Sequence, residues 1–255
     1  MDGVMSGYAE LEFDLPSALL SSVLKSLGTI EAVPLTMAAT SQIPEEQGVY
    51  QIFHEGRPVY VGKTDAEAGL ARRLLRHSRK IVHRRNLDPN SVTFKALRIY
   101  VFTAMDIESD LIKAYGGVRA LAWNGSGFGS NDPGRERDTT RNKAGNFDAL
   151  YPADIDLPLV FDGADKLTAS EALSAIRAKV PWSLRAQRRS QNGPPHAART
   201  DTLVKLPPGI RPARPAIAEV VGQLPTGWQA TKLLGYVILY KERREYPDAE
   251  IIALS

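Results

Sequence analysis

Apolar residues follow a helical spacing near the start of the chain. A predicted amphipathic helix over residues 14–27 places five of them on one face: Leu19, Leu20, Val23, Leu24 and Leu27. Asp14 stands before this stretch as the expected N-cap, and Gly28 follows it as the expected stop. A helix of this kind buries its apolar face, so we expect it to pack on the core of the protein.

Two short runs rich in β-branched and aromatic residues come next. Residues 49–53 and 58–62 predict a β-hairpin whose connection is residues 54–57. Residues 64–67, Thr-Asp-Ala-Glu, then have the form of a capping box and predict a helix that runs to about Arg85. The predicted order is therefore strand, strand, helix.

The middle of the chain predicts a third strand and a further helix before the regular patterns stop. Residues 94–102 are rich in aromatic and β-branched residues. Residues 103–106 repeat the capping form and open a helix that should stop at Gly116 and Gly117. Residues 124–145 are rich in Gly, Asn, Asp and Arg, which excludes a regular element there.

The last part of the chain mixes one capped helix with proline-rich sequence. Residues 168–171 cap a short helix that must end near Pro181. Residues 193–215 hold six prolines and several arginines, which suits an extended arm, a docked loop or a flexible connector. Residues 233–240 and 250–254 predict two closing strands.

The bulk composition predicts a soluble globular protein. Of the 255 residues, 43% are apolar and 24% are charged, and no apolar run approaches the ~20 residues needed to span a bilayer. The first eight residues lack the features of a secretory signal, and the absence of cysteine suits a reducing cytoplasm, so we expect a cytoplasmic protein without a membrane partner. The absence of cysteine also excludes disulfides, thiolate zinc sites and a cysteine nucleophile. The length suits one large domain, or a catalytic core with modest additions, folded as one compact unit.

Positive charge is concentrated in two blocks, although the net charge is only +3. Residues 63–101 hold ten Lys or Arg against three acids, and residues 177–215 hold nine against Asp201 alone. Residues 1–47 hold seven acids and a single base, Lys25. Two basic blocks suit a polyanionic partner such as nucleic acid, because neutralised phosphates supply sequence-independent affinity. The alternative is a pair of solvated surface faces.

Five side chains could supply the groups that phosphodiester hydrolysis needs. Tyr50 and Tyr60 fall on adjacent strands, so their phenols can meet at one end of the sheet. Arg73 and His77 are four residues apart and share a helix face. Glu108 lies one turn before two apolar residues that should anchor its helix, so its carboxylate should turn inward. The alternatives are two ordinary strand aromatics, a surface arginine, a satisfied histidine and a helix-surface glutamate.

Six sequence features follow one another along residues 48–124. They are two triplets and four single residues: Gly48-Val49-Tyr50, Tyr60-Val61-Gly62, Arg73, His77, Glu108 and Asn124. This series resembles the GIY-YIG nuclease superfamily. The resemblance implies an α+β fold with a small antiparallel sheet flanked by helices, and a nuclease core over residues 48–150. Residues 1–47 would be a helical extension packed on that core, and residues 151–255 a C-terminal extension with a DNA-recognition arm and closing strands.

The sequence after Asn124 narrows the resemblance. The run comprises Trp123-Asn124, Gly127-Phe128-Gly129, the residues Asn-Asp-Pro-Gly at 131–134, and Arg137-Asp138. It resembles the type II restriction endonucleases of the superfamily, of which the best known cut the palindrome CCGCGG. The implied activity is Mg²⁺-dependent hydrolysis that makes double-strand breaks in palindromic, GC-rich DNA, with CCGCGG as the candidate site.

The resemblance also implies roles for the two tyrosines. Tyr50 would act as the general base toward water, assisted by His77 or by Lys63. The pKa of a free phenol lies near ~10, so a nearby cation must stabilise the phenolate for this role near neutral pH. Tyr60 would support the phosphate or the network of phenols.

The remaining matches would handle the phosphate and the metal. Arg73 would hold the scissile phosphate or the water, and Glu108 would bind one Mg²⁺, for which Mn²⁺ can substitute. Asn124 would orient its neighbours. A double-strand break needs two such sites about a two-fold axis, so we expect a homodimer on double-stranded DNA.

Arginine is the residue that most readily reads guanine in the major groove. Seven candidate readers lie in the glycine-rich segment and the second basic block: Arg135, Arg137, Arg141, Arg185, Arg188, Arg189 and Arg199. The alternative is that most of them contact only phosphate or solvent. His196 has no assigned role. Two other function classes stay open, namely a repair or homing-type GIY-YIG nuclease and a DNA-binding protein that does not cleave.

Overall fold

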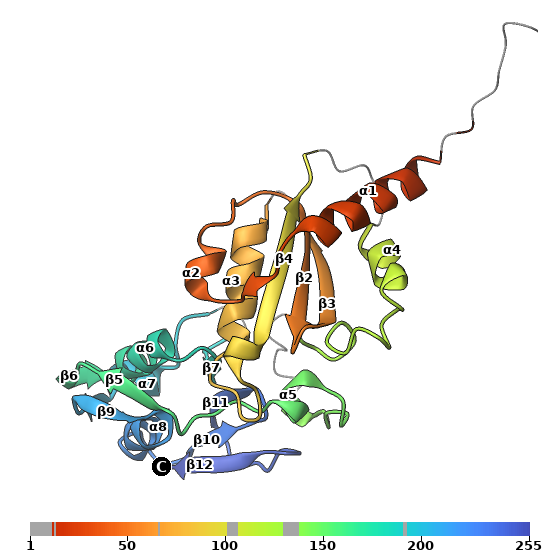
Figure 1. Cartoon of the computed structure of the whole chain (residues 1–255). Helices are drawn as coiled ribbons and strands as arrows, with labels where there is room; N and C mark the ends of the chain where they lie inside the picture. The colour runs from red at the N-terminus through yellow and green to blue at the C-terminus, as the bar shows by residue number, and fades with distance from the viewer. Residues whose placement is uncertain (1–11, 13, 66, 101–106, 130–137, 191–192) are drawn as a thin grey trace, which may run out of the picture.

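The protein has an α+β fold in which two four-stranded sheets, one in each half of the chain, are covered by helices (Figure 1). The computed structural model describes the following residues: 12, 14–65, 67–100, 107–129, 138–190 and 193–255. No helix within these ranges has the length and apolar composition needed to cross a membrane. The expected class, α+β with a small antiparallel sheet and flanking helices, is confirmed.

The first sheet is antiparallel and carries helices on both faces. Its strands are β1 (Val33–Pro34), β2 (Gly48–His54), β3 (Arg57–Thr64) and β4 (Val92–Arg98), in the spatial order β1-β4-β2-β3. The helices are α1 (Leu15–Thr29), α2 (Met37–Thr40), α3 (Leu70–Ile81), the 3-10 turn η1 (Pro89–Ser91) and α4 (Ile107–Ala114). Side chains alternate across β2, so Tyr50 and Ile52 pack with α3 whereas Val49 packs with α1 and α4. Each face of the sheet therefore has its own core.

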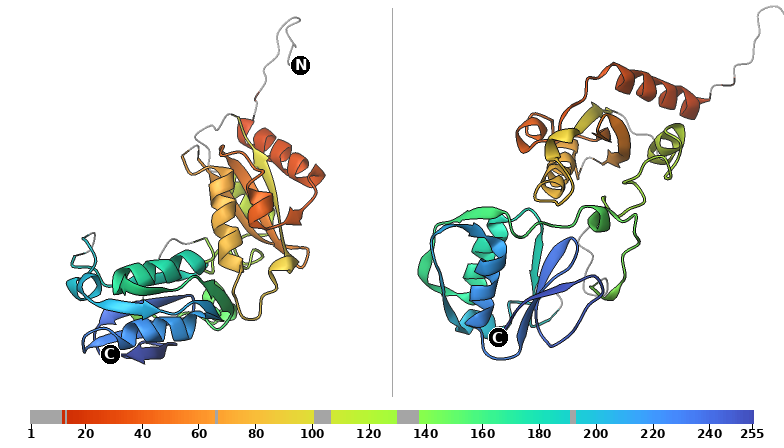
Figure 2. Two further views of the ribbon diagram at one scale, coloured as in Figure 1. Left: turned by 90° about the vertical axis from the view of Figure 1, so that its left-hand side faces the viewer. Right: turned by 60° about the horizontal axis from the view of Figure 1, so that its bottom comes forward.

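The second half of the chain builds a mixed sheet and two ribbons, with one main core and a smaller apolar cluster that includes Tyr236, Ile238 and Tyr240. The four sheet strands are β7 (Ser183–Ala186), β10 (Trp228–Lys232), β11 (Tyr236–Lys241) and β12 (Glu250–Leu254). The ribbons pair β5 (Pro158–Phe161) with β9 (Gly209–Pro212) and β6 (Ala164–Thr168) with β8 (Leu203–Leu206). The helices are α5 (Phe147–Leu150), α6 (Ala169–Lys179), α7 (Ala197–Asp201) and α8 (Ala213–Gly222). The order is β12-β10-β11-β7, in which β7 runs parallel to β11, and α6 and α8 cover the sheet (Figure 2).

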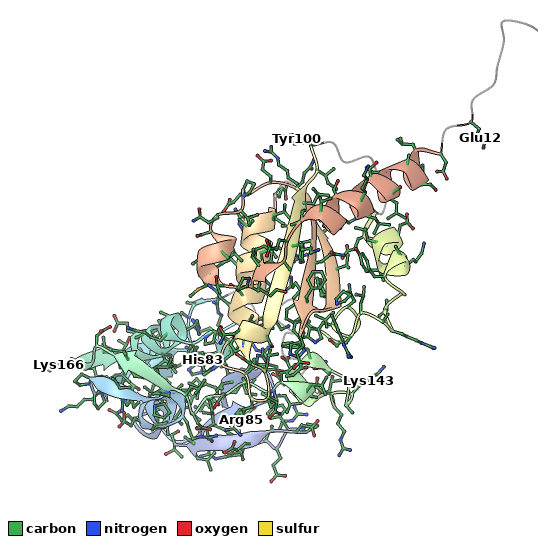
Figure 3. All side chains as sticks on the ribbon, viewed as in Figure 1. Glu12, His83, Arg85, Tyr100, Lys143 and Lys166 are labelled. Carbon is green, nitrogen blue, oxygen red and sulfur yellow. The ribbon has the colours of Figure 1, made fainter. Side chains whose placement is uncertain are left out.

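The two halves meet where the chain leaves α3. Arg84 Nη1 lies 2.8 Å from Asp148 Oδ1, and the Arg84 side chain is only 5% exposed. The backbone N–H of Asp154 donates to the carbonyl of His83 at 2.8 Å. His83 and Arg85 lie between the two sheets (Figure 3). The end of α3 therefore joins the halves through a buried ion pair and a backbone hydrogen bond.

The first predicted helix and the hairpin are confirmed. Asp14 caps α1 through its side chain, which accepts from the N–H of Ser17, although α1 includes Gly28 and ends one residue later. The hairpin connection is tighter than predicted, because His54 and Arg57 pair with each other. Two residues make the turn, and the glycine at position 56 takes the positive φ that the turn needs.

The predicted start and end of the next helix are wrong. Thr64 is the last residue of β3, where it pairs with Gly48, so it cannot cap a helix. The Asp65 side chain accepts from the N–H of Ala68 and forms a turn before α3 begins. The helix ends at residue 81 instead of 85, because His83 takes a positive φ of 54°. Strand pairing has overridden a local capping signal.

The later predictions have mixed outcomes. β4 ends at residue 98, and the predicted cap at residues 103–106 lies outside the described residues. α4 is followed as expected by Gly116 and Gly117, both with positive φ, and Thr168 forms the predicted capping box. Of the three alternatives for residues 193–215, the docked one is observed, because α7, β8 and β9 lie there. β11 and β12 match the predicted closing strands, whereas β10 is not predicted from the sequence.

The joint between the halves can be tested through its ion pair. Replacing Asp148 by Ala leaves the buried guanidinium of Arg84 without its carboxylate, so we expect a loss of about 3 kcal/mol in the free energy of unfolding. Asp162→Ala removes the exposed pair with Lys179 and should cost no more than about 0.5 kcal/mol. Unfolding in urea measures both losses of stability. Equal losses in the two variants would contradict the conclusion that the buried ion pair stabilises the protein.

Candidate active site

The hairpin places the two signature tyrosines against each other. Tyr50 is opposite Gly62 in the register, and Tyr60 is opposite Ile52, so both phenols leave the same face of the sheet. Their ring centroids are 5.9 Å apart. A Cβ at position 62 would lie 2.5 Å from the Tyr50 hydroxyl oxygen. The glycine of the second triplet therefore makes room for the phenol of the first.

His77 holds the Tyr50 phenol from the opposite side. The Tyr50 hydroxyl lies 2.9 Å from His77 Nε2. His77 is on the buried stripe of α3 with Leu70, Leu74 and Ile81, and it is only 1% exposed. Its other ring nitrogen, Nδ1, is buried and has no hydrogen-bond partner among the described residues. The packing of α3 therefore turns His77 toward the sheet.

Both members of this hydrogen bond are neutral. Burial, together with the neighbouring Tyr60, raises the pKa of Tyr50 well above its usual value. Burial lowers the pKa of His77 well below its usual value, and Arg73 lowers it further. A neutral phenol keeps its proton and a neutral imidazole offers one lone pair. A neutral phenol can donate or accept, so the tautomer of His77 sets the direction of this hydrogen bond.

Two opposite charges flank the phenols. Arg73 lowers and Glu108 raises the pKa of Tyr50, and both act in the same directions on the pKa of Tyr60. Arg73 lies on α3, and its Nε is buried without a hydrogen-bond partner among the described residues. Glu108 lies in the first turn of α4 and is half-buried. The cation and the carboxylate thus act electrostatically on the same pair of phenols, from helices on opposite sides of the sheet.

Lys63 occupies the other face of the hairpin. It is opposite Val49 and shares a strand face with Val61, and both valines pack with α1 and α4. The Tyr50 phenol points to the α3 side. Of the two assistants expected for Tyr50, the geometry favours His77.

Asn124 binds backbone. Its Oδ1 accepts from the N–H of Val61 at 2.9 Å, and its Nδ2 donates to the carbonyl of the same residue at 2.8 Å. Beside it, the N–H of Trp123 donates to the carbonyl of Val59. β3 is the edge strand of its sheet, so these bonds dock the following segment along that edge. This matches the expectation that Asn124 orients its neighbours.

Residues 127–129 cover His77, and their role was not foreseen from the sequence. The Phe128 ring stacks on the imidazole with centroids 4.7 Å apart and planes 12° apart. Lys80 Nζ donates to the carbonyls of Gly127 and Phe128 at 2.8 and 2.7 Å. Arg76 donates to the carbonyl of Gly129 at 3.2 Å. The spacing of Arg76 and Lys80, one turn apart on the same helix as His77, is the signal that could have indicated this contact.

Glu108 is the carboxylate of this site that could bind a metal ion. Among the described residues, no three His, Asp or Glu side chains gather as a group that could hold an ion. Glu108 is nevertheless placed where its charge acts on both phenols. Mg²⁺ is often bound by one carboxylate, with water and substrate oxygens in its other positions. The residues present fit such an ion.

The predicted DNA-reading arginines fall into three groups. Arg141, Arg188 and Arg189 are exposed. Arg185 and Arg199 are largely internal, which makes them unsuited to reading bases in this conformation. Arg135 and Arg137 lie outside the described residues.

Both internal arginines have protein partners. The Arg185 guanidinium is hydrogen-bonded to the fully buried carboxylate of Asp138 and lies over the ring of Tyr236. Arg199 donates to the carbonyl of Gln187 at 2.6 Å. Charge in the sequence does not reveal such partners, since they come from distant segments.

His196, which had no assigned role, caps a helix. Its Nδ1 accepts from the N–H of Ala198 at the start of α7, and its ring meets Trp228 edge-on. Histidine is an uncommon capping residue, which explains why the sequence gave no signal. The role seen in the structure is local.

Comparison with models of known protein families gave no match, and comparison with curated protein sequences gave none. The features that define the site are therefore those of the chain itself: two phenols, a neutral histidine, an arginine and a carboxylate at one end of a small sheet. These groups suit acid–base chemistry beside a negatively charged substrate.

The close contact of residue 129 with Tyr60 predicts a stability effect. In Gly129→Ala the new Cβ would lie 2.4 Å from the Tyr60 hydroxyl oxygen, so we expect a loss of about 2 kcal/mol. Gly145→Ala, which has open space around its new Cβ, should change stability by less than about 0.5 kcal/mol. Removing the hydroxyl with Tyr60→Phe should recover part of the loss in a double-mutant cycle. Strictly additive urea midpoints would count against the contact.

The lowered pKa of His77 predicts acid sensitivity. Below about pH 6.5 the unfolded chain takes up a proton that the buried imidazole refuses, so the free energy of unfolding should fall as the pH drops. His77→Asn should lose less stability than wild type between pH about 7.5 and about 5 in urea unfolding. His83→Asn is a comparison that should alter the pH profile less, because Asp154 offsets part of the lowering that burial imposes on the pKa of His83. A wild-type pH profile in His77→Asn would contradict the assignment.

Proposed function

We propose that this protein is a metal-dependent DNA endonuclease of the GIY-YIG type that acts as a type II restriction enzyme. The observation that carries the proposal is the 2.9 Å hydrogen bond between Tyr50 and a buried, neutral His77, flanked by Arg73 and Glu108. Its support in the sequence is the ordered series of residues from Gly48 to Asn124.

The geometry supports a proton relay through Tyr50. As the phenol oxygen takes a proton from the attacking water, its own proton can pass to the lone pair of His77 Nε2. The low pKa of His77 means that it holds this proton only briefly, which suits a relay. The route needs no free phenolate before the substrate arrives. It requires the His77 tautomer that carries its proton on Nδ1, which leaves the Nε2 lone pair to accept.

Arg73 and Glu108 would divide the charges of the reaction. The unpartnered Nε of Arg73 is suited to a phosphate oxygen and would offset the charge that develops there. Glu108 would hold Mg²⁺, which when bound stabilises charge on the phosphate and on the leaving oxygen. Tyr60 would keep the Tyr50 ring in place by stacking on it.

The DNA partner and the assembly are part of the same proposal. The two basic blocks supply attraction for a duplex, and a homodimer would place one site on each strand of a palindrome. Exposed arginines of the second half, such as Arg188 and Arg189, would contact the DNA. A repair or homing-type nuclease and a non-cleaving DNA-binding protein are the competing functions.

Cleavage of plasmid DNA tests the proposal. With Mg²⁺ we expect discrete fragments whose sequenced ends share a palindrome, and a loss of at least ~100-fold in rate for Glu108→Gln and Tyr50→Phe. Asp110→Asn is the matched control, because Asp110 lies on the same helix but pairs with Lys113. It should cut like wild type.

Each other outcome favours a different function. Random nicks or cuts at branched structures would indicate a repair-type nuclease. DNA binding without cleavage in the presence of any divalent ion would indicate a non-cleaving protein. Activity that survives Glu108→Gln would contradict the assigned metal ligand.

A further inference from the structure

Three arginines from separate segments converge at the end of β7. Arg177 lies on α6, Arg188 follows β7 by two residues, and Arg199 lies on α7. Arg177 Nε donates to the carbonyl of Leu184 at 3.0 Å, and Arg199 Nη2 donates to the carbonyl of Gln187 at 2.6 Å. Arg188 is the next residue along the chain. Carbonyls of this short stretch of backbone thus anchor Arg177 and Arg199, and Arg188, whose Nη1 lies 3.5 Å from the carbonyl of Gly193, starts from the same stretch.

The three groups lack a counter-charge. Within the described part of the chain, none of them pairs with a carboxylate, whereas Arg211 and Arg214 of the same half both do. The guanidinium groups are close enough for Arg177 and Arg188 to act on the pKa of Arg199, which burial first and these two cations second lower to about 10. Like charges held together without an acid are costly unless an anion joins them.

The three side chains differ in their access to solvent. Arg199 is only 4% exposed, and its Nε is buried without a hydrogen-bond partner among the described residues. Arg177 and Arg188 are exposed. An anion arriving from solvent would contact the two exposed guanidinium groups, and the positive charge of the buried third group would attract it. The planar donor fork of arginine matches the oxygens of phosphate.

We infer that Arg177, Arg188 and Arg199 form an oxyanion site that binds one phosphate group. The source that fits the rest of the molecule is a backbone phosphate of DNA, and this part of the inference rests on the proposed function. Free inorganic phosphate has the same chemistry. In this arrangement Arg177 and Arg188 contact the phosphate, the buried Arg199 adds positive charge behind them, and none of the three reads a base.

The salt dependence of DNA binding tests a shared phosphate. A fluorescent duplex that carries CCGCGG is titrated without divalent ions, so that it stays intact, at several salt concentrations. The slope of log K against log salt concentration is negative, and losing one phosphate contact reduces its magnitude by about 1. The double variant Arg177→Gln/Arg188→Gln should therefore have a slope about 1 smaller in magnitude than wild type. Lys179→Gln is the matched control, because Lys179 lies on the same helix and already pairs with Asp162.

Inorganic phosphate provides the second arm. At constant ionic strength, phosphate should raise the Tm of wild type and of Lys179→Gln, and the shift should be lost in Arg177→Gln/Arg188→Gln. A phosphate shift without any DNA binding would leave the oxyanion site standing and reject DNA as its source. This outcome is distinct from a failure of cleavage, which concerns Tyr50 and Glu108.

Two results would overturn the inference. If the slope for the double variant falls by about 2, the two exposed arginines contact separate phosphates and share no site. If the slope and the phosphate shift are both the same in the double variant as in wild type, the three arginines hold no phosphate. Both readouts use the full chain, and both variants replace exposed side chains, so folding is preserved and can be checked by the Tm without phosphate.

Discussion

The buried hydrogen bond between Tyr50 and His77 is the constraint on which the first half of the protein depends. Burial disfavours a charge on either group, and each provides the hydrogen-bond partner that the buried polar atom of the other needs. To bring them within 2.9 Å, the hairpin and α3 must pack with a fixed register and a fixed rotation. Gly62 removes the side chain that would otherwise separate them. The packing of the fold and the chemistry of the site thus both require these residues in the same arrangement.

The charged residues around this pair divide into those that the protein itself uses and those that it leaves available. Arg76 and Lys80 are tied to carbonyl oxygens of the segment that covers His77. Arg84 is tied to Asp148 at the joint between the halves. Arg73, on the same helix, keeps a buried Nε without a partner among the described residues. The basic helix α3 therefore has two functions. Some of its cations bind other parts of the protein and Arg73 is left available, and the position of a residue on the helix decides between the two.

Local patterns predicted the elements that depend on neighbours in sequence. The hairpin, α1 with its Asp14 cap and α6 with its capping box follow from residues a few positions apart. The start of α3 could not be predicted, because Thr64 is claimed by strand pairing.

The candidate site was predictable to the same extent. The spacing of Arg73 and His77 placed both on one helix face, since four residues make about one turn. The cover provided by Phe128 and the burial of Arg185 and Arg199 were not predictable. They depend on contacts that the fold makes between separate segments: Phe128 with His77, Asp138 with Arg185, and Gln187 with Arg199. Charge and composition carry no information about such contacts between separate segments.

The bonds made by Asn124 and Trp123 have a consequence for assembly. An edge strand with free N–H and C=O groups invites another chain to add a strand. Here the edge of β3 is occupied, because Val59 and Val61 already bond to those two residues. The other edge of the sheet is the two-residue strand β1, which offers little length for pairing. The first sheet is therefore closed to strand addition at Val59 and Val61 and short at β1, so it offers a second copy of the chain little backbone to pair with.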